Sequence, residues 1–176
     1  LRFAREYYHI SESYQVNDMG KLNELCDAFV LGSDQIWNYG ITKIFGHSYF
    51  LDFADDGKKK IAYATSFGQS KFLAPWDYAK KAVACMQRMD AVSVREKEGV
   101  KILREVFGVK GIHVLDPVLM ADPSVLGNLA DKAARKENSP YIATYILDPD
   151  EKKREALLHV SKKLNRKLVN MLDGWY

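Results

Sequence analysis

Short apolar runs bounded by glycine, proline or charged residues recur along the chain. Runs of this kind are typical of buried strands. We therefore predict strands at residues 28–31, 60–65, 91–94, 112–115, 141–147 and 167–173. The segment SYFLDFA at 48–54 is another apolar run, and it lies just before a charged turn.

Between the strands, apolar residues recur three and four positions apart, which is the spacing of an amphipathic helix. One such segment begins at Pro75, a residue favoured in the first helical turn. A second covers 96–107 and is followed by Gly108, where a left-handed C-cap belongs. A third follows DPDE, in which Asp148 is the expected cap and Glu151 can close a capping box.

The amino-terminal 16 residues are aromatic-rich and weakly patterned, so we expect an irregular segment or a frayed helix there. A short helix capped by Asn17 or Asp18 would follow. The alternation of strands and helices predicts an α/β fold, a Rossmann-like parallel sheet with helices on both faces. Residues 1–122 would belong to one such domain, 123–139 would form a linker, and 140–176 would begin a second, truncated domain.

The composition, 47% hydrophobic and 28% charged, is that of a soluble globular protein with a sizeable core. The net charge of +3, from 26 basic and 23 acidic residues, is too small to indicate a nucleic-acid partner. The densest basic run, at 58–60, follows a DDG turn, so we expect a solvated loop, with an anion-binding patch as the alternative. Phosphate-loop, dinucleotide and nucleophile-elbow motifs are absent, which disfavours nucleotide-loop enzymes, simple dehydrogenases and the usual serine hydrolases.

The two cysteines, Cys26 and Cys85, lie far apart in helical patterns, and each is expected to be a small buried thiol. Together with the lack of an N-x-[ST] acceptor, they suit a reducing cytoplasm. No apolar run is long enough to span a membrane, and the first ten residues lack the apolar core of a signal peptide. The four histidines are scattered without ligand spacing, so we expect no metal. Both ends of the chain suggest a piece of a longer protein.

Polar and small residues follow four of the predicted strands, at the edge where an open parallel sheet binds its ligands. They are Gly32, Ser33 and Asp34 after the first strand, Ser66 and Gly68 after the second, Arg95 after the third and Asp116 after the fourth. Arginine can hold a carboxylate or phosphate with two hydrogen bonds, and a carboxylate can accept a proton from a hydroxyl nucleophile. This rim therefore suits an anionic small molecule together with a polyhydroxylated acceptor.

Each candidate also has a purely structural interpretation. The two aspartates suit turn caps, and the segment 66–68 suits a simple turn. Arg95 can instead pair with Glu98 or Glu105 on the following helix. Trp37 is expected in the core, with an aromatic plate beneath a sugar as the alternative.

Five sequence strings add a family resemblance. DAFVLGSDQIWN, YFLDFA, KKIAYATSFG, DAVSVREKEGVKIL and VLDPVLM occur in this order between residues 27 and 120. In that order they resemble the polysaccharide pyruvyl transferase family, which includes exopolysaccharide and cell-wall pyruvyltransferases. The resemblance implies a GT-B-like architecture of two Rossmann-like domains, with residues 1–122 as the carboxy-terminal portion of the first.

The resemblance also implies a transferase that moves pyruvate from phosphoenolpyruvate onto a pair of sugar hydroxyls of a polysaccharide precursor, forming a cyclic ketal. Arg95 would bind the donor, Asp34 with Ser33 would orient or deprotonate the acceptor, and the loop 66–68 would offer backbone donors. No cofactor beyond the donor substrate is implied. The expected location is the cytoplasm, and peripheral association with lipid-linked glycan at the membrane would fit the family.

Two other classes of function stay open. One is a GT-B glycosyltransferase that uses a nucleotide sugar, and the other is a non-catalytic glycan-binding relative. Side chains of Ser33, Asp34 and Arg95 that share a cleft favour an enzyme, whereas caps and ion pairs that consume them favour a binding protein. Because family members are much longer, we expect this segment alone to be catalytically incomplete.

Overall fold

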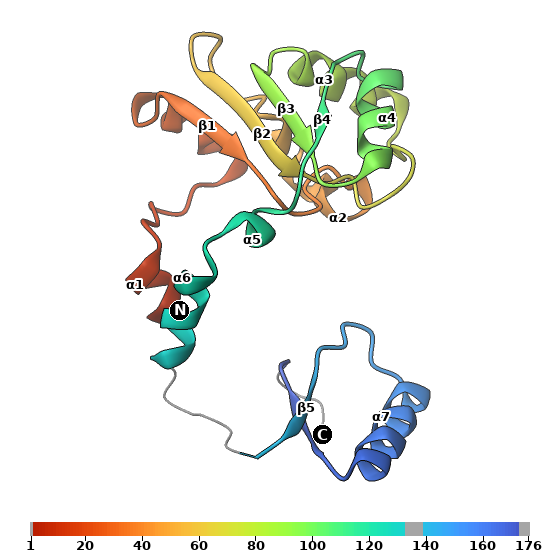
Figure 1. Ribbon diagram of the computed structural model, residues 1–176. Helices are drawn as coiled ribbons and strands as arrows, with labels where there is room; N and C mark the ends of the chain where they lie inside the picture. Colours follow the sequence, from red (N-terminus) through yellow and green to blue (C-terminus); the bar gives the residue numbers. More distant parts are fainter. Residues whose placement is uncertain (1, 133–138, 173–176) are drawn as a thin grey trace. The chain divides into compact units, whose positions relative to one another are not determined.

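A computed structural model describes residues 2–132 and 139–172 of the chain (Figure 1). The chain divides into two compact units, 1–121 and 122–176. Unit 1 is an α/β unit built on a four-stranded sheet, and unit 2 is a smaller β-α-β unit.

The sheet of unit 1 is entirely parallel, as predicted. Its strands are β1 (Ala28–Leu31), β2 (Lys59–Thr65), β3 (Ala91–Val94) and β4 (Ile112–His113). They lie in the order β1-β2-β3-β4, so each strand pairs with the next one along the chain. All carboxyl ends therefore meet at one edge of the sheet, where the sequence places its candidate site residues.

Helices and short 3-10 segments connect the strands. They are α1 (Arg2–Tyr7), η1 (Val16–Glu24), α2 (Tyr39–Thr42), η2 (Lys43–Phe45), η3 (Ser48–Phe50), α3 (Trp76–Met86), α4 (Lys97–Glu105) and α5 (Pro117–Met120). Gln15 precedes η1 without a side-chain cap, so neither Asn17 nor Asp18 has the expected capping role. Gly108 has a φ of +66°, as expected for a residue that ends a helical segment.

The main core lies between the sheet and the helices α3 and α4, whose apolar faces join one cluster of buried side chains. Aromatic residues fill its centre: Trp37, Phe50, Phe67 and Phe107 are each at most 1% exposed. The Trp37 Nε1–H donates to the carbonyl of Tyr49 at 2.8 Å, so the indole is fully used within the core. Trp37 is thus a core residue, and the alternative of a sugar-stacking plate is wrong.

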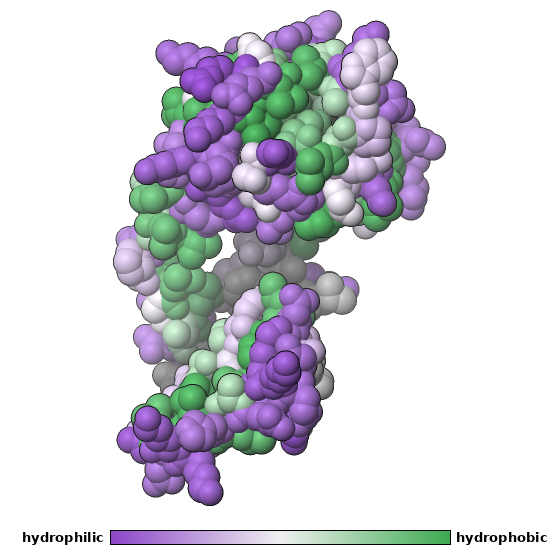
Figure 2. All heavy atoms as spheres, turned by 90° about the vertical axis from the view of Figure 1, so that its right-hand side faces the viewer, coloured by the Kyte–Doolittle hydropathy of each residue, from purple (hydrophilic) through white to green (hydrophobic). Residues whose placement is uncertain are grey.

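Only one face of this sheet is covered by the described helices. Val30 and Tyr63 alternate with buried residues along β1 and β2, and they are 66% and 39% exposed. When parallel strands follow one another in chain order, their right-handed connections all lie on the same side. The prediction of helices on both faces is therefore wrong for the described part of unit 1. Hydrophobic residues outside the sheet are also exposed at the surface, and Figure 2 shows them in green on one side of the molecule.

Lys60 is buried within β2 and is only 2% exposed. Its ammonium group donates to the carbonyls of Asp55 at 2.6 Å and Lys58 at 2.9 Å. The expectation of a solvated loop at 58–60 is wrong here, because strand alternation places Lys60 on the same face as the buried Ala62.

The cysteines differ in burial. Cys85 in α3 is buried, as predicted, and burial raises the pKa of its thiol. Cys26 is only partly buried and packs beside the smaller cluster around Phe29.

Unit 2 contains α6 (Pro123–Asp131), β5 (Tyr141–Thr144), α7 (Glu151–Leu164) and β6 (Lys167–Asn170). Strands β5 and β6 are parallel. Helix α6 lies within the segment 123–139, and residues 133–138 of that segment lie outside the described residues. Asp150, and not Asp148, caps α7, because its carboxylate accepts the backbone N–H of Lys153 at 2.8 Å.

Candidate active site

Backbone hydrogen bonds join the segments that follow β1, β2 and β3. The Ser66 N–H donates to the carbonyl of Asp34 at 3.1 Å, and the Arg95 N–H donates to the carbonyl of Thr65 at 3.2 Å. The three segments are thus fixed against one another at the carboxyl edge of the sheet, where a parallel sheet binds ligands.

The Arg95 guanidinium lies between two carboxylates. Its Nη1 is 2.9 Å from the Oδ2 of Asp116, and its Nη2 is 3.7 Å from the Oδ1 of Asp34. The Ser33 hydroxyl donates to the same Asp116 oxygen at 3.4 Å. Four sequence-predicted site residues therefore form one group, which we call the Arg95 cluster: Ser33, Asp34, Arg95 and Asp116.

The alternative partners of Arg95 are not used. Arg95 forms ion pairs neither with Glu98 nor with Glu105 among the described residues, and Glu105 instead approaches Arg104 at 3.0 Å. The guanidinium thus crosses the edge of the sheet instead of lying along α4.

Asp116 both caps a helix and holds Arg95. Its Oδ1 accepts the backbone N–H of Val118 at 3.0 Å, which caps α5. This hydrogen bond, followed by the one from Arg95, holds the pKa of the Asp116 carboxyl below its usual range. Asp116 is therefore an anchor for Arg95 that stays ionised at neutral pH.

Asp34 is less constrained. Its Oδ1 accepts the N–H of Gln35 at 2.7 Å, yet 87% of its side chain is exposed to solvent. The preceding Gly32 lies so close to β2 that a Cβ atom there would stand 2.1 Å from the carbonyl oxygen of Tyr63. Glycine at this position lets β1 and β2 end side by side and presents Asp34 at the rim.

The loop 66–68 is held by Glu96, which is not among the site residues predicted from the sequence. The Glu96 Oε1 accepts the Ser66 hydroxyl at 3.0 Å and the Phe67 N–H at 2.8 Å, and the Gly68 N–H donates to the Ser66 hydroxyl at 2.9 Å. The backbone donors that we expected this loop to offer to a ligand are thus used within the protein. The position of Glu96, directly after Arg95 at a strand end, was the available signal.

Gly68 has a φ of +62°, which favours glycine, and a Cβ atom there would stand 2.0 Å from the Gln35 Oε1. Its expected role as a turn former thus agrees with the backbone. The positive φ and the close approach of Gln35 are sufficient to account for glycine at position 68.

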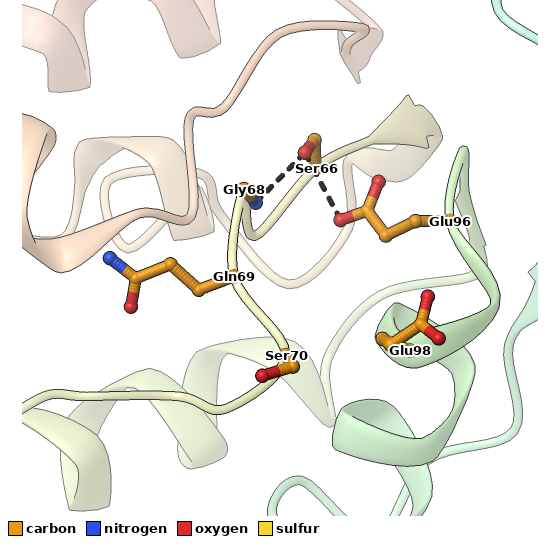
Figure 3. A pocket seen from close by; sticks show the side chains of 6 residues that line it. All are labelled: Ser66, Gly68, Gln69, Ser70, Glu96 and Glu98. Atoms are coloured by element: carbon orange, nitrogen blue, oxygen red, sulfur yellow. Dashed lines mark hydrogen bonds between the residues drawn. The ribbon is translucent and has the colours of Figure 1, made fainter.

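A pocket of about 320 Å³ opens beside this loop (Figure 3). It is lined by Ser66, Gly68, Gln69, Ser70, Glu96 and Glu98. Figure 3 shows the Glu96 side chain turned toward Ser66, with Glu98 on the adjacent helix. We call this the Glu96 pocket. It contains hydroxyl, amide and carboxylate groups and no cationic side chain.

The Arg95 cluster and the Glu96 pocket adjoin in the chain, because Arg95 and Glu96 are consecutive residues at the end of β3. Together they contain one cationic side chain and the carboxylates of Asp34, Asp116, Glu96 and Glu98. The balance of charge is negative. It favours ligand hydroxyls over a highly charged anion unless further cations contribute.

Within the ranges 2–132 and 139–172, no group of three or more histidine, cysteine, aspartate or glutamate side chains is arranged to hold a metal ion. No helix in the same ranges is long and apolar enough to cross a membrane.

The family model for polysaccharide pyruvyl transferase matches residues 2–173, which is nearly the whole chain. No curated protein and no solved structure matches the chain significantly. The family indicates a transferase that acts on a glycan acceptor. The chain belongs to the polysaccharide pyruvyl transferase family.

Proposed function

We propose that the protein transfers pyruvate from phosphoenolpyruvate to two hydroxyls of one sugar residue in a polysaccharide precursor, forming a cyclic ketal. Membership of the family supports a glycan-modifying transferase. The single observation that carries the proposal is the Arg95 cluster, in which a guanidinium and an exposed carboxylate lie together at the carboxyl edge of a parallel sheet.

The proposed reaction begins with protonation of the methylene carbon of phosphoenolpyruvate, which builds cationic character at the adjacent carbon. One sugar hydroxyl attacks that carbon, and phosphate leaves with the electrons of its C–O bond. A second hydroxyl closes the ring, and the two hydroxyl protons are released to bases. The products are the ketal and inorganic phosphate.

Arg95 is the proposed contact for the carboxylate or phosphate of the donor. Its hydrogen bond to Asp116 is short, whereas its approach to Asp34 is 3.7 Å and open to solvent. An incoming anion can therefore replace Asp34 at Nη2 while Asp116 continues to hold Nη1. The remaining charge of the donor requires cations from outside the Arg95 cluster.

Asp34 is the proposed base for the acceptor. A general base must reach the hydroxyl that it deprotonates. Of the two carboxylates in the Arg95 cluster, that of Asp34 is the more exposed to solvent. When the donor replaces Asp34 at Arg95, the Asp34 carboxylate would become available to a sugar hydroxyl.

A non-catalytic glycan-binding relative remains the second candidate function. The observation that favours it is the charge balance, since Asp116 already satisfies Arg95 and caps α5. We further propose that units 1 and 2 each belong to one Rossmann-like domain of a GT-B-like protein, because unit 2 is a parallel β-α-β unit.

Isothermal titration of the full-length protein with phosphoenolpyruvate tests the function. Arg95→Ala should weaken binding by about tenfold or more, because a charge-assisted hydrogen bond is lost. Arg104→Ala is the matched control, since Arg104 is an exposed arginine that pairs only with Glu105 among the described residues, and it should bind like the wild type.

Absence of binding by the wild-type protein would overturn the proposed donor. Equal binding by the wild type and Arg95→Ala would overturn the role of Arg95. Binding of phosphoenolpyruvate without release of phosphate in the presence of any glycan acceptor would favour the glycan-binding relative.

A further inference from the structure

The Glu96 pocket presents polar groups that the protein itself does not use. In the part of the chain that the structure describes, Glu98 and Ser70 form no side-chain hydrogen bond or ion pair. Gln69 donates from its amide nitrogen to Asn38 at 3.3 Å, and Figure 3 shows its side chain turned away from Glu96 and Glu98. Glu96 uses only one carboxylate oxygen, Oε1, for its contacts with the loop.

The unused groups are mostly hydrogen-bond acceptors. A carboxylate accepts hydrogen bonds only, while the Ser70 hydroxyl can donate or accept. A matching ligand must therefore be rich in donors. The two carboxylates, Glu96 and Glu98, disfavour phosphate and carboxylate ligands in this pocket and suit a neutral molecule with several hydroxyls.

Glu96 is fixed before any ligand arrives. The Ser66 hydroxyl and the Phe67 N–H hold its Oε1 at 3.0 and 2.8 Å, and Ser66 is only 3% exposed. The free oxygen of the same carboxylate is thus held in place without further loss of side-chain freedom. Such preorganisation strengthens the binding of a small polar ligand.

The pocket also adjoins the proposed base. The Ser66 N–H donates to the carbonyl of Asp34, and Glu96 directly follows Arg95 in the chain. A sugar in the Glu96 pocket would therefore lie at the same edge of the sheet as the Arg95 cluster, where the donor is proposed to bind.

We propose that the Glu96 pocket is the subsite for the acceptor sugar, and that it takes a neutral glycoside through adjacent hydroxyls that donate to Glu96 and Glu98. This inference rests on the proposed function for its place in the reaction. The class of ligand, a neutral molecule with several hydroxyls, is inferred only from the side chains that line the pocket.

The test follows the backbone amide signals of Gly68, Gln69 and Ser70 in the full-length protein by NMR during titration with methyl glycosides of glucose, galactose and mannose. At least one glycoside should shift these three signals. Glu98→Gln should weaken that binding by about tenfold, because a hydrogen bond to a charged acceptor becomes a neutral one. Glu105→Gln, which alters another exposed carboxylate of α4 outside the pocket, should bind like the wild type.

Shifts that are absent with all three glycosides would overturn the subsite, as would equal affinity of the wild type and Glu98→Gln. Shifts caused by methylammonium but by no glycoside would assign the pocket to cations and would also overturn it. The proposed function fails separately, through absence of phosphoenolpyruvate binding, so the two failures are distinguishable.

Discussion

The guanidinium of Arg95 and the carboxylate of Asp116 lie 2.9 Å apart, between Nη1 and Oδ2. This ion pair joins the residue that follows β3 to the residue that caps α5. Its side chains are 29% and 26% exposed, so solvent screens the pair only partly. It is therefore the contact that sets the direction of Arg95.

Asp116→Asn should change the dependence of stability on pH. The pKa of Asp116 is lowered in the folded state, so its contribution to stability is present above the pKa of the unfolded chain, about 4, and is lost as the pH falls through the lowered folded value. The variant should therefore lose less stability than the wild type on acidification. Urea unfolding midpoints measured from neutral to acidic pH provide the test, and parallel curves would contradict it.

Glu96→Ala should free the loop 66–68 without unfolding the protein. The Phe67 N–H would lose its acceptor, so its amide hydrogen should exchange with solvent faster than in the wild type. Glu96→Gln keeps an oxygen in the same place and should restore much of the protection. Hydrogen-exchange NMR of the three proteins would contradict the role of Glu96 if Phe67 exchanged equally in all of them.

Lys60→Ala should destabilise the protein by about 1–3 kcal/mol, because it leaves the carbonyls of Asp55 and Lys58 without their buried donor. Lys59→Ala is the matched control. Lys59 pairs with Asp90 at the surface, and exposed ion pairs contribute only about 0–1 kcal/mol. Urea denaturation of both variants gives the comparison, and an equal loss would show that the burial of Lys60 has no energetic role.

Gly32→Ala should destabilise the protein by about 2 kcal/mol or more, because the added methyl group would clash with the carbonyl oxygen of Tyr63. Gly57→Ala is the control, since nothing lies within 4 Å of a Cβ atom at that position. Its effect should stay within about 0.5 kcal/mol. Thermal unfolding distinguishes the two variants, and a tolerated Gly32→Ala would contradict the close approach of β1 and β2.

Much of the fold could be predicted because its strands are short apolar runs with clear ends. The runs at 28–31 and 91–94 coincide with β1 and β3, since Gly32 and Arg95 interrupt each run where the strand ends. Lys60 was misplaced because buried lysines are rare. The signal for its burial is the period of two along β2, which places Lys60 on the same strand face as the apolar Ala62 and Ala64.

The residues of the candidate site could be selected from their places after the strands, but their contacts could not. Arg95 has several carboxylates within reach along the sequence, and only the folded chain selects Asp116. Glu96 resembles an ordinary residue before a helix, yet its carboxylate leaves α4 uncapped and turns to the loop of β2. Which side chain Arg95 or Glu96 contacts depends on how distant segments pack in the folded protein. The spacing of residues along the sequence does not give this information.

The strand order of unit 1 has a consequence for how the protein folds. Each strand of the sheet pairs with its immediate successor in the chain, so no pairing has to wait for a distant segment. The entropy lost on closing a loop grows with the length of that loop, and local pairings form fastest. The sheet can therefore grow in the direction of synthesis, with each strand docking on the one that left the ribosome before it.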